Sequence, residues 1–357
     1  MASFSRSPCC RQFEAAGYLA SRHVCEWHSD KNPEQLRPFL LSRRIPQANA
    51  HHVSFKWRDH EFLDLNTDLG SLGVFSLEVL HQILHQLDIG SLARLQCASQ
   101  GMKRAVGSLP MLRALLDFDP AIIRGIAATK TGSLIVCREL YDKFCSPVCD
   151  TCDEAGTYLY LLTCKRVCAQ CLTKTYQYRP MRPLQAKTWY GVDNETLRRL
   201  PGLTVPTYRT RCGAARSSNS SFYYRIPKVT GWRLIDQTAL MKASMRKYGS
   251  FFRITDQRFS KTLEAFRRVW MRIGRVGTAR WNIGTQYKMA GVETSLACAT
   301  EFQWFDRNSG TTGVPMRCVA CLGSGTERWY YTKGGFEEHE KTKGKVINAT
   351  HRPDLLE

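Results

Sequence analysis

The chain has 357 residues, of which 43% are hydrophobic and 23% are charged. This balance permits packed cores and excludes a chain that is disordered throughout, because disordered chains lack the apolar side chains that a core needs. The first twenty residues contain charges and no continuous apolar run, and no later stretch has the length of a membrane span. We therefore expect an intracellular protein of the cytoplasm or nucleus with no membrane segment.

The formal net charge of +20 is unevenly distributed along the chain. Residues 176–290 contain 23 Lys and Arg against five Asp and Glu, so this segment carries most of the excess. Such an excess favours an acidic partner, which could be a nucleic acid, an acidic protein face or a membrane surface. A solvated surface that keeps the domain soluble explains the same charge.

The cysteine count bears on metal binding. Fifteen cysteines in an intracellular chain are expected to stay reduced, so we interpret them as metal ligands and buried thiols rather than disulfides.

In chain order, residues 1–70 lack periodicity and are expected to form a flexible leader. A helix is predicted next, because apolar residues at i, i+3, i+4 and i+7 line one face of it. Ser76 can cap its start, and Glu78 lies in its first turn, where the helix dipole favours a negative charge. Asp88 to Gly90 should end the helix, Ser91 should cap the next one, and Pro110 allows a last short helix. The range 71–118 is therefore predicted to be a compact three-helix unit.

This helical unit resembles the F-box. The matching positions include an opening apolar residue, a Glu, a leucine-rich helix, an Asp and a Ser-Leu pair, while Ser76 stands where the family has proline. The resemblance implies docking to the small Skp-type adaptor and, through it, to a cullin ubiquitin ligase. The partner-binding positions it implies are Phe75, Leu77, Glu78, Leu80, Ile83, Leu84, Leu87, Leu92 and Leu95.

Two other interpretations of the same helices remain open. An ordinary helical hairpin inside a core would show similar periodicity. A helix-turn-helix DNA reader is also conceivable, although its only basic residues between 91 and 108 would be Arg94, Lys103 and Arg104.

A helical connector and a cysteine-rich segment are expected over 119–175. The pattern Cys-x2-Cys, fifteen residues, Cys-x2-Cys predicts a structural zinc site with four protein ligands, because each pair can aim two thiolates at one ion from a tight turn. Alternation at Tyr158, Tyr160 and Leu162 predicts a short strand, so a treble-like or ribbon-like knuckle is expected between the pairs. The predicted ligands are Cys149, Cys152, Cys168 and Cys171, with Cys145 and Cys164 as possible replacements or buried thiols.

This segment also resembles the cysteine knuckle that follows the F-box in a group of fungal F-box proteins. In the same group a second Cys-x2-Cys pair precedes an aromatic stretch, a Phe and a His, with one further Cys. Here Cys318, Cys321 and His339 match, and no Cys follows. His351 or Cys298 could supply a fourth ligand, or the site could be degenerate.

The remaining elements are less sharply marked. Residues 172–235 should be loops with short strands, 235–248 and 255–273 should be helices, and 292–331 should be strand-like. The fold class predicted for the whole chain is α+β, mostly helical, with a three-helix box, a small zinc knuckle and a mixed, irregular C-terminal region over 176–357.

No catalytic motif is present, since the chain lacks a Walker loop, a Gly-x-Ser-x-Gly elbow and a His-Glu-x-x-His helix. The expected function is therefore a non-enzymatic, substrate-recruiting subunit of a Skp–cullin–F-box ubiquitin ligase, whose C-terminal half binds a substrate that the sequence does not identify. One alternative is an F-box protein that acts outside a ligase. Another is a zinc-stabilised nucleic-acid-binding protein, whose contacts would be Lys242, Arg246, Lys247, Arg267, Arg268, Arg272 and Arg275.

Overall fold

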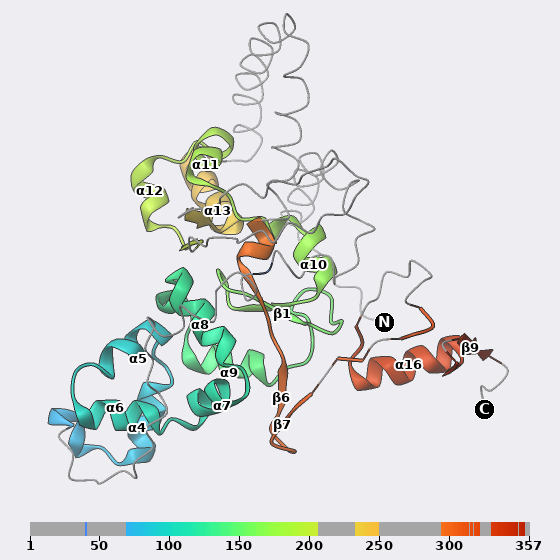
Figure 1. Ribbon diagram of the computed structural model, residues 1–357. Coiled ribbons are helices and arrows are strands. Elements are labelled where there is room, and N and C mark those ends of the chain that lie inside the picture. Colours follow the sequence, from blue (N-terminus) through green and yellow to red (C-terminus); the bar gives the residue numbers. More distant parts are fainter. Residues whose placement is uncertain are drawn as a thin grey trace, which may run out of the picture.

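The computed structural model describes Leu40 and residues 69–205, 233–249, 294–313, 315–316, 318–321, 330–348 and 350–353. Within these parts the fold is a mixture of short helices and small antiparallel sheets, which confirms the α+β class (Figure 1). The predicted leader, apart from Leu40, Leu69 and Gly70, and the predicted helix over 255–273 lie outside the described residues.

The predicted three-helix unit contains four α-helices. They follow a short 3₁₀ helix, η4 (Gly70–Val74), and are α4 (Leu77–Leu84), α5 (Ile89–Leu95), α6 (Gln100–Gly107) and α7 (Pro110–Phe118). The count differs because Ser99 breaks the apolar pattern that runs from Leu92 to Leu109. Its hydroxyl accepts a hydrogen bond from the backbone N–H of Met102 at 3.1 Å, so α6 begins here as a separate helix.

N-caps were also predicted for the helices now labelled α4 and α5, and the structure confirms the first and corrects the second. Ser76 is the N-cap of α4, as expected, and accepts from the backbone N–H of Val79 at 3.5 Å. The N-cap of α5 is Asp88 rather than Ser91. The Asp88 carboxylate accepts both the N–H and the hydroxyl of Ser91, at 2.8 and 2.6 Å, because it lies three residues before that N–H.

The middle of the chain forms a helical layer and a small sheet. Its helices are α8 (Pro120–Thr129), η5 (Gly132–Leu134), α9 (Cys137–Phe144) and α10 (Ala169–Lys174), and its strands are β1 (Tyr158–Tyr160), β2 (Lys165–Val167) and β5 (Ala299–Glu301). The strand order is β2-β1-β5, and both pairings are antiparallel. A strand from the C-terminal region thus completes the sheet of the cysteine-rich segment.

A second, smaller core lies beyond this sheet. Its buried residues come from α11 (Pro183–Tyr190), α12 (Asn194–Arg199), the end of β4 (Arg233–Ile235) and α13 (Gln237–Tyr248). The elements η6 (Tyr176–Tyr178) and β3 (Gly202–Thr204), which pairs with β4, border both cores. The helix predicted over 235–248 is thereby confirmed, whereas α11 and α12 replace the loops expected there. Pro183 opens α11 and Asp193 caps α12, so two short helices form where no long apolar period marks them.

The last described elements are two hairpins and a helix. They are β6 (Trp304–Asp306), β7 (Thr311–Gly313), α16 (Lys333–Lys343), β8 (Lys345–Ile347) and β9 (Thr350–Arg352). The helix α16 contains no buried residue. Side-chain burial therefore contributes little to holding α16, whereas Phe305 of β6 is buried in the main core.

One continuous core joins the helical unit to the cysteine-rich segment. Buried leucines of α4 to α7 belong to the same cluster as Cys149, Cys171 and the residues of β1. The backbone also crosses between the two parts, since Ile89 N–H donates to the Ile135 carbonyl at 2.9 Å and Cys137 N–H donates to the Leu87 carbonyl at 3.0 Å. Leu40 is fully buried in this core as well.

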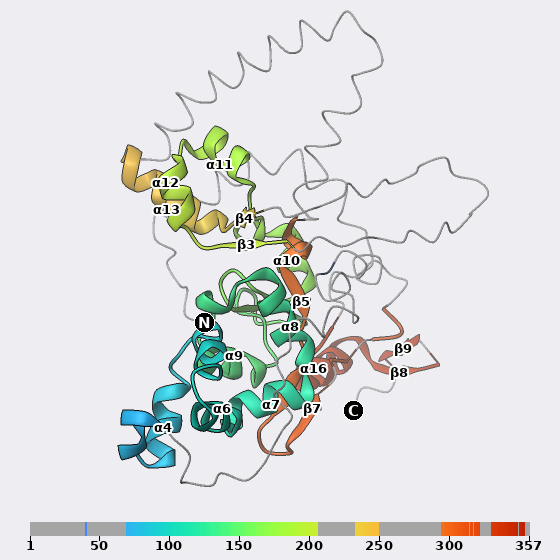
Figure 2. The same ribbon diagram turned by 60° about the vertical axis from the view of Figure 1, so that its left-hand side comes forward.

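The two views place the elements consistently. The helices α4 to α6 lie at one end of the molecule, and α11 to α13 lie at the other, with α8 and α10 between them (Figures 1 and 2). Among the helices that the structure describes, none combines the length and the apolar character needed to span a bilayer.

Candidate metal centres and the exposed face of the helical unit

The first cysteine cluster, called the first centre, is built from a tight turn and a helix start. In the turn, Cys149 N–H donates to the Glu154 carbonyl at 2.6 Å, and Asp153 adopts a positive φ of 59°. The hairpin β1-β2 then returns the chain to Cys168, which is the N-cap of α10. Cys171 lies in the first turn of that helix, so the local folding of both pairs brings four thiols together.

The geometry of the first centre suits a tetrahedral ion. The sulfur atoms of Cys149, Cys152, Cys168 and Cys171 all lie within 4.8 Å of one another. The Sγ atoms of Cys152 and Cys168 are 3.6 Å apart. A tetrahedral zinc ion with Zn–S bonds of about 2.3 Å requires sulfur separations of about 3.8 Å. The donor set therefore fits zinc closely, with all four positions supplied by protein.

The thiols of the first centre perturb one another strongly. Hydrogen bonds from Cys168 and Cys171 lower the pKa of Cys149 far below the usual thiol range. The same contact with Cys149 raises the pKa of Cys168 to about 12 and also raises that of Cys171. The cluster thus accommodates one negative charge readily and resists further ionisation, because thiolates in contact repel. A bound divalent cation would offset that repulsion.

The two further cysteines of this segment lie outside the cluster. Cys164 is 1% exposed in the core, at the β1-β2 turn, and burial raises its pKa. Cys145 follows α9 and packs against the edge of the same core. Among the described residues the cluster of four includes neither. Both are therefore placed as packed thiols, one of the two roles that the sequence allowed.

The second cluster, called the second centre, has a fourth member. Cys318, Cys321, His339 and His351 have one ligand atom each within 4.8 Å of all the others. The Nε2 atom of His351 lies 3.3 Å from the sulfur of Cys318 and 3.2 Å from that of Cys321. Nε2 of His339 lies 3.6 Å from the Cys321 sulfur. These separations match the roughly 3.5 Å expected between sulfur and nitrogen ligands of one zinc ion.

In both histidines the second ring nitrogen, Nδ1, has a polar partner that fixes the orientation of the ring. Nδ1 of His351 lies 2.9 Å from the Gly344 carbonyl, to which it can donate only when protonated. Nδ1 of His339 lies 3.3 Å from the Tyr331 hydroxyl. A proton on Nδ1 would leave the Nε2 lone pair directed into the cluster, an arrangement typical of zinc-binding histidines. Of the two residues considered for the fourth position, Cys298 instead lies buried beside β5, where its carbonyl accepts from Leu161 N–H at 2.9 Å.

Substitution of His351 tests the second centre. We expect His351→Ala to lose the metal of this centre while the first centre keeps its own, because the two share no ligand. The melting temperature should change little, since α16 buries no side chain in the core. Metal content by inductively coupled plasma mass spectrometry and a thermal melt provide the measurement. His85→Ala, a histidine outside both clusters, is the matched control. Equal metal content in His351→Ala and the parent chain would contradict the assignment.

The helical unit separates its apolar residues into two sets. Leu80, Leu84 and Leu92 are buried, whereas Leu77, Leu87 and Leu95 are partly buried, and the last two pack against the core. Phe75 and Ile83 are 43% and 40% exposed, and Glu78 is exposed as well. Sequence periodicity did not distinguish the inward from the outward residues.

Two further exposed apolar residues adjoin the second set. Val74 is 81% exposed and Val79 is 39% exposed. Val79 and Ile83 are four residues apart on α4 and share one side of it, whereas Phe75 lies just before the helix, next to its N-cap Ser76. Neither valine was among the predicted partner-binding residues, although the four-residue spacing could have revealed Val79. We call Val74, Phe75, Val79 and Ile83 the apolar row.

The residues proposed for nucleic-acid contact are only partly described. Lys242 and Arg246 are exposed on α13, and Lys247 forms an ion pair with Asp193 at 3.2 Å. The four arginines between 267 and 275 lie outside the described residues.

Comparison with protein-family models, with curated proteins and with solved structures finds no match for this chain.

Proposed function

We propose that this chain is a substrate-recruiting adaptor of the Skp–cullin–F-box type, in which the helical unit binds the Skp-type adaptor and zinc occupies both metal centres. The observation that carries the proposal is the apolar row. Its four side chains are between 39% and 81% exposed, next to leucines that are almost completely buried. A stripe of exposed apolar residues on a well-packed helical unit is typical of a surface that a partner covers.

The position of the row supports docking by a partner helix. Val79 and Ile83 form a strip on one side of α4 that an apolar helix face can cover, and Phe75 lies just before the start of the helix. The buried leucines of the same helix hold that strip rigidly on the core. Binding of a partner to the row also costs little conformational entropy, because the residues that form the row are already held by the helical unit.

Zinc is the metal that the donor sets favour. Four thiolates, or two thiolates and two imidazoles, with tetrahedral separations are typical of structural zinc sites. All positions in both centres are filled by protein atoms, so the metals would hold the fold together rather than activate a substrate. The two centres would thereby stabilise the receptor half of the molecule. We propose no catalytic role for either metal.

Substitution within the apolar row tests the proposal. We expect Ile83→Glu to reduce retention of the recombinant Skp-type adaptor in a pull-down by at least about tenfold, because a charge placed at a dry apolar contact costs more than the 1.4 kcal/mol that a tenfold change requires. The fold should persist, since Ile83 is 40% exposed and lies outside the core. Retention is measured by quantitative immunoblot and the fold by a thermal melt.

A matched control separates loss of docking from a general effect of the new charge. Leu184 is 76% exposed on α11, far from the row, so Leu184→Glu adds the same group at an exposed apolar site and should retain the adaptor. Leu84→Asp and Leu92→Asp are unsuitable probes, because both residues are buried and their loss would destabilise the core. Failure of the parent chain to retain the adaptor, or equal retention by Ile83→Glu, would contradict the proposal.

A further inference from the structure

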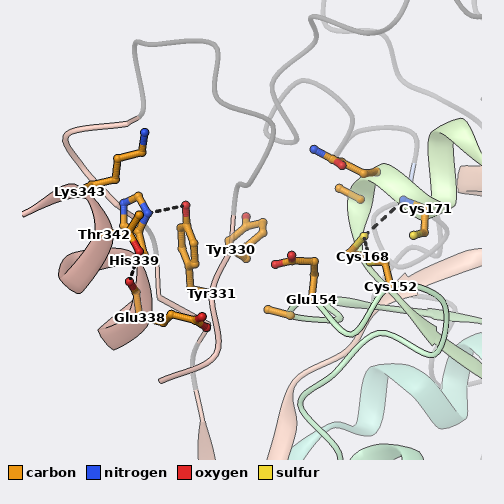
Figure 3. Close-up of a pocket in the computed structure, with 13 residues that line it drawn as sticks. Cys152, Glu154, Cys168, Cys171, Tyr330, Tyr331, Glu338, His339, Thr342 and Lys343 are labelled. Carbon is orange, nitrogen blue, oxygen red and sulfur yellow. Dashed lines mark hydrogen bonds between the residues drawn. The ribbon is translucent and has the colours of Figure 1, made fainter. Parts of the chain in front are cut away.

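A cavity of about 570 Å³ lies between the two metal centres (Figure 3). One wall is formed by the first centre, where Cys152, Cys168 and the turn residue Glu154 face the cavity. The opposite wall is formed by residues 330–331 and by α16 of the second centre. The volume lies in the range of sites that enclose a ligand or one or two side chains of a partner.

Acidic and aromatic groups converge on this space from both walls. Figure 3 shows Glu154 on the side of the first centre and Glu338 on the side of α16, with the ring of Tyr330 between them. Tyr331 lines the same wall as Glu338. Carboxylates bind guanidinium and ammonium groups through charge-assisted hydrogen bonds, and tyrosine rings attract the same cations through their faces.

The charge of the cavity opposes the charge of the chain. Among its described lining residues, Lys343 is the one lysine or arginine and stands against two glutamates. With a divalent ion bound, the four thiolates of the first centre add a further net charge of about −2 at the wall. The whole chain carries +20, so this is a negative site on a strongly positive molecule. A cationic guest is attracted here, whereas an anion meets like charge.

We propose that this cavity binds a basic side chain, arginine or lysine, presented by the protein substrate. The inference rests on the proposed function, since it names the chemistry by which the receptor half would select its substrate. Glu154 and Glu338 would each accept hydrogen bonds from the cationic head, and Tyr330 would contact its face. The two glutamates belong to neither metal cluster, so their substitution removes no candidate metal ligand.

The test uses three peptides that differ at one position. Nonapeptides of alternating Gly and Ser with Arg, Lys or Gln at the centre are added to the full, metal-loaded chain at low ionic strength. Binding is followed by saturation-transfer NMR, which detects weak complexes. We expect transfer to the central side chain of the Arg or Lys peptide and none to that of the Gln peptide, with the signal falling as salt rises.

Variants assign that signal to the cavity. Glu154→Gln combined with Glu338→Gln should weaken binding at least fivefold, because both charged acceptors are lost. Glu337→Gln is the matched control, since Glu337 is the exposed neighbour on α16 and does not line the cavity. Metal content is measured in each variant. If the double variant loses metal from the nearby first centre, Glu338→Gln alone provides the reading, because Glu338 lies on the other wall and holds no metal.

Three results would overturn the inference. They are equal signals from the Arg, Lys and Gln peptides, no signal from either basic peptide, and unchanged binding in the metal-loaded glutamate variants. Ile83→Glu should bind the basic peptide as the parent does, whereas the glutamate variants should retain the Skp-type adaptor. Failure of the cavity and failure of adaptor docking are therefore distinguishable.

Discussion

Cys149→Ser is expected to abolish the cooperative unfolding transition of this chain. Cys149 is completely buried and belongs to the same core as α4 to α9 and the β1 strand. Serine is a poor zinc ligand, so the substitution should release the metal of the first centre and leave three thiols in contact without a cation. The core around them would then lose the link between the turn at 149–154 and the start of α10.

The expected magnitude is comparable with the whole stability of the domain. Structural zinc contributes about 10–16 kcal/mol of apparent binding free energy in small zinc domains, and folded domains are typically stable by about 5–15 kcal/mol. Loss of this site therefore leaves little or no net stability. Loss of the second centre should be milder, because α16 contributes no buried side chain.

The experiment compares near-ultraviolet circular dichroism, thermal melts and metal content of the parent, Cys149→Ser and Cys97→Ser. Cys97 is exposed on the helical unit and lies outside both clusters, so its variant should melt and bind metal as the parent does. Removal of metal from the parent by a strong chelator should reproduce the effect of Cys149→Ser. A Cys149→Ser chain with the parent's melting temperature would show that the first centre does not stabilise the core.

The metal centres were visible in the sequence because their information is local. A Cys-x2-Cys pair can form a ligand-bearing turn by itself, so Cys149 and Cys152 predict a metal site before any tertiary structure is known. The fourth position of the second centre was not decidable in this way. The sequence left open whether His351 or Cys298 completes the site or whether it is degenerate, and only the β8-β9 hairpin, which brings His351 back beside α16, decides between them.

In the helical unit, too, the sequence predicted the helices, which depend on nearby residues, but not the burial of each side chain, which depends on tertiary packing. Its helix-forming periodicity predicted α4 and the start of α7 at Pro110, but periodicity records only that a residue is apolar. Leu84 and Ile83 are neighbours in the same helix, yet one is 1% and the other 40% exposed. Their difference depends on packing against α6 and the following helices, which no spacing within α4 reveals. Likewise, β5 joins β1 from about 140 residues further along the chain, beyond any local pattern.

Arg166 was another residue that the sequence did not single out, although it connects three distant segments. The residue is 0% exposed. Its guanidinium donates to the carbonyls of Lys143, Gly156, Phe302 and Gln303, at distances between 2.6 and 3.1 Å. It thereby ties the end of α9 and the approach to β1 to the segment that follows β5. The same group stacks over the Phe302 ring, 4.2 Å from its centroid.

The space beside Arg166 and the charges near it are compatible with a buried, charged guanidinium. A Cβ atom on Gly156 would overlap the buried Arg166 side chain, so a larger residue at that position would displace the guanidinium from its carbonyl partners. Burial lowers the pKa of Arg166 to about 9, which still leaves it charged at neutral pH. Burial also raises the pKa of Asp119 to about 6, while attraction to Arg166 opposes that rise. Asp119 is 8% exposed, and its ionised form is favoured by the backbone N–H of Gln303 and by the nearby Arg166.

We expect Arg166→Met to lower the free energy of unfolding by about 3–5 kcal/mol at neutral pH, because it leaves buried carbonyl groups without donors and a buried carboxylate without its counter-charge. The loss should depend on pH. The folded-state pKa of Asp119 lies above its unfolded value, so the native state binds the extra proton and stability from this group falls as pH rises through about 6. Without Arg166 the ionised carboxylate is still less favourable, and the variant should be penalised more at pH 8 than at pH 5.

Urea unfolding at both pH values measures this difference. Arg113→Met, at an exposed position of α7, is the matched control and should unfold like the parent at either pH. Methionine keeps the unbranched apolar stem of arginine but lacks the guanidinium, so the loss at Arg166 includes the space that this group leaves, and the difference between the two pH values reports the charge. A loss below about 1 kcal/mol, the usual scale of an exposed polar contact, would mean that the carbonyls find other donors and that packing of β5 on β1 suffices to hold the C-terminal region to the first centre.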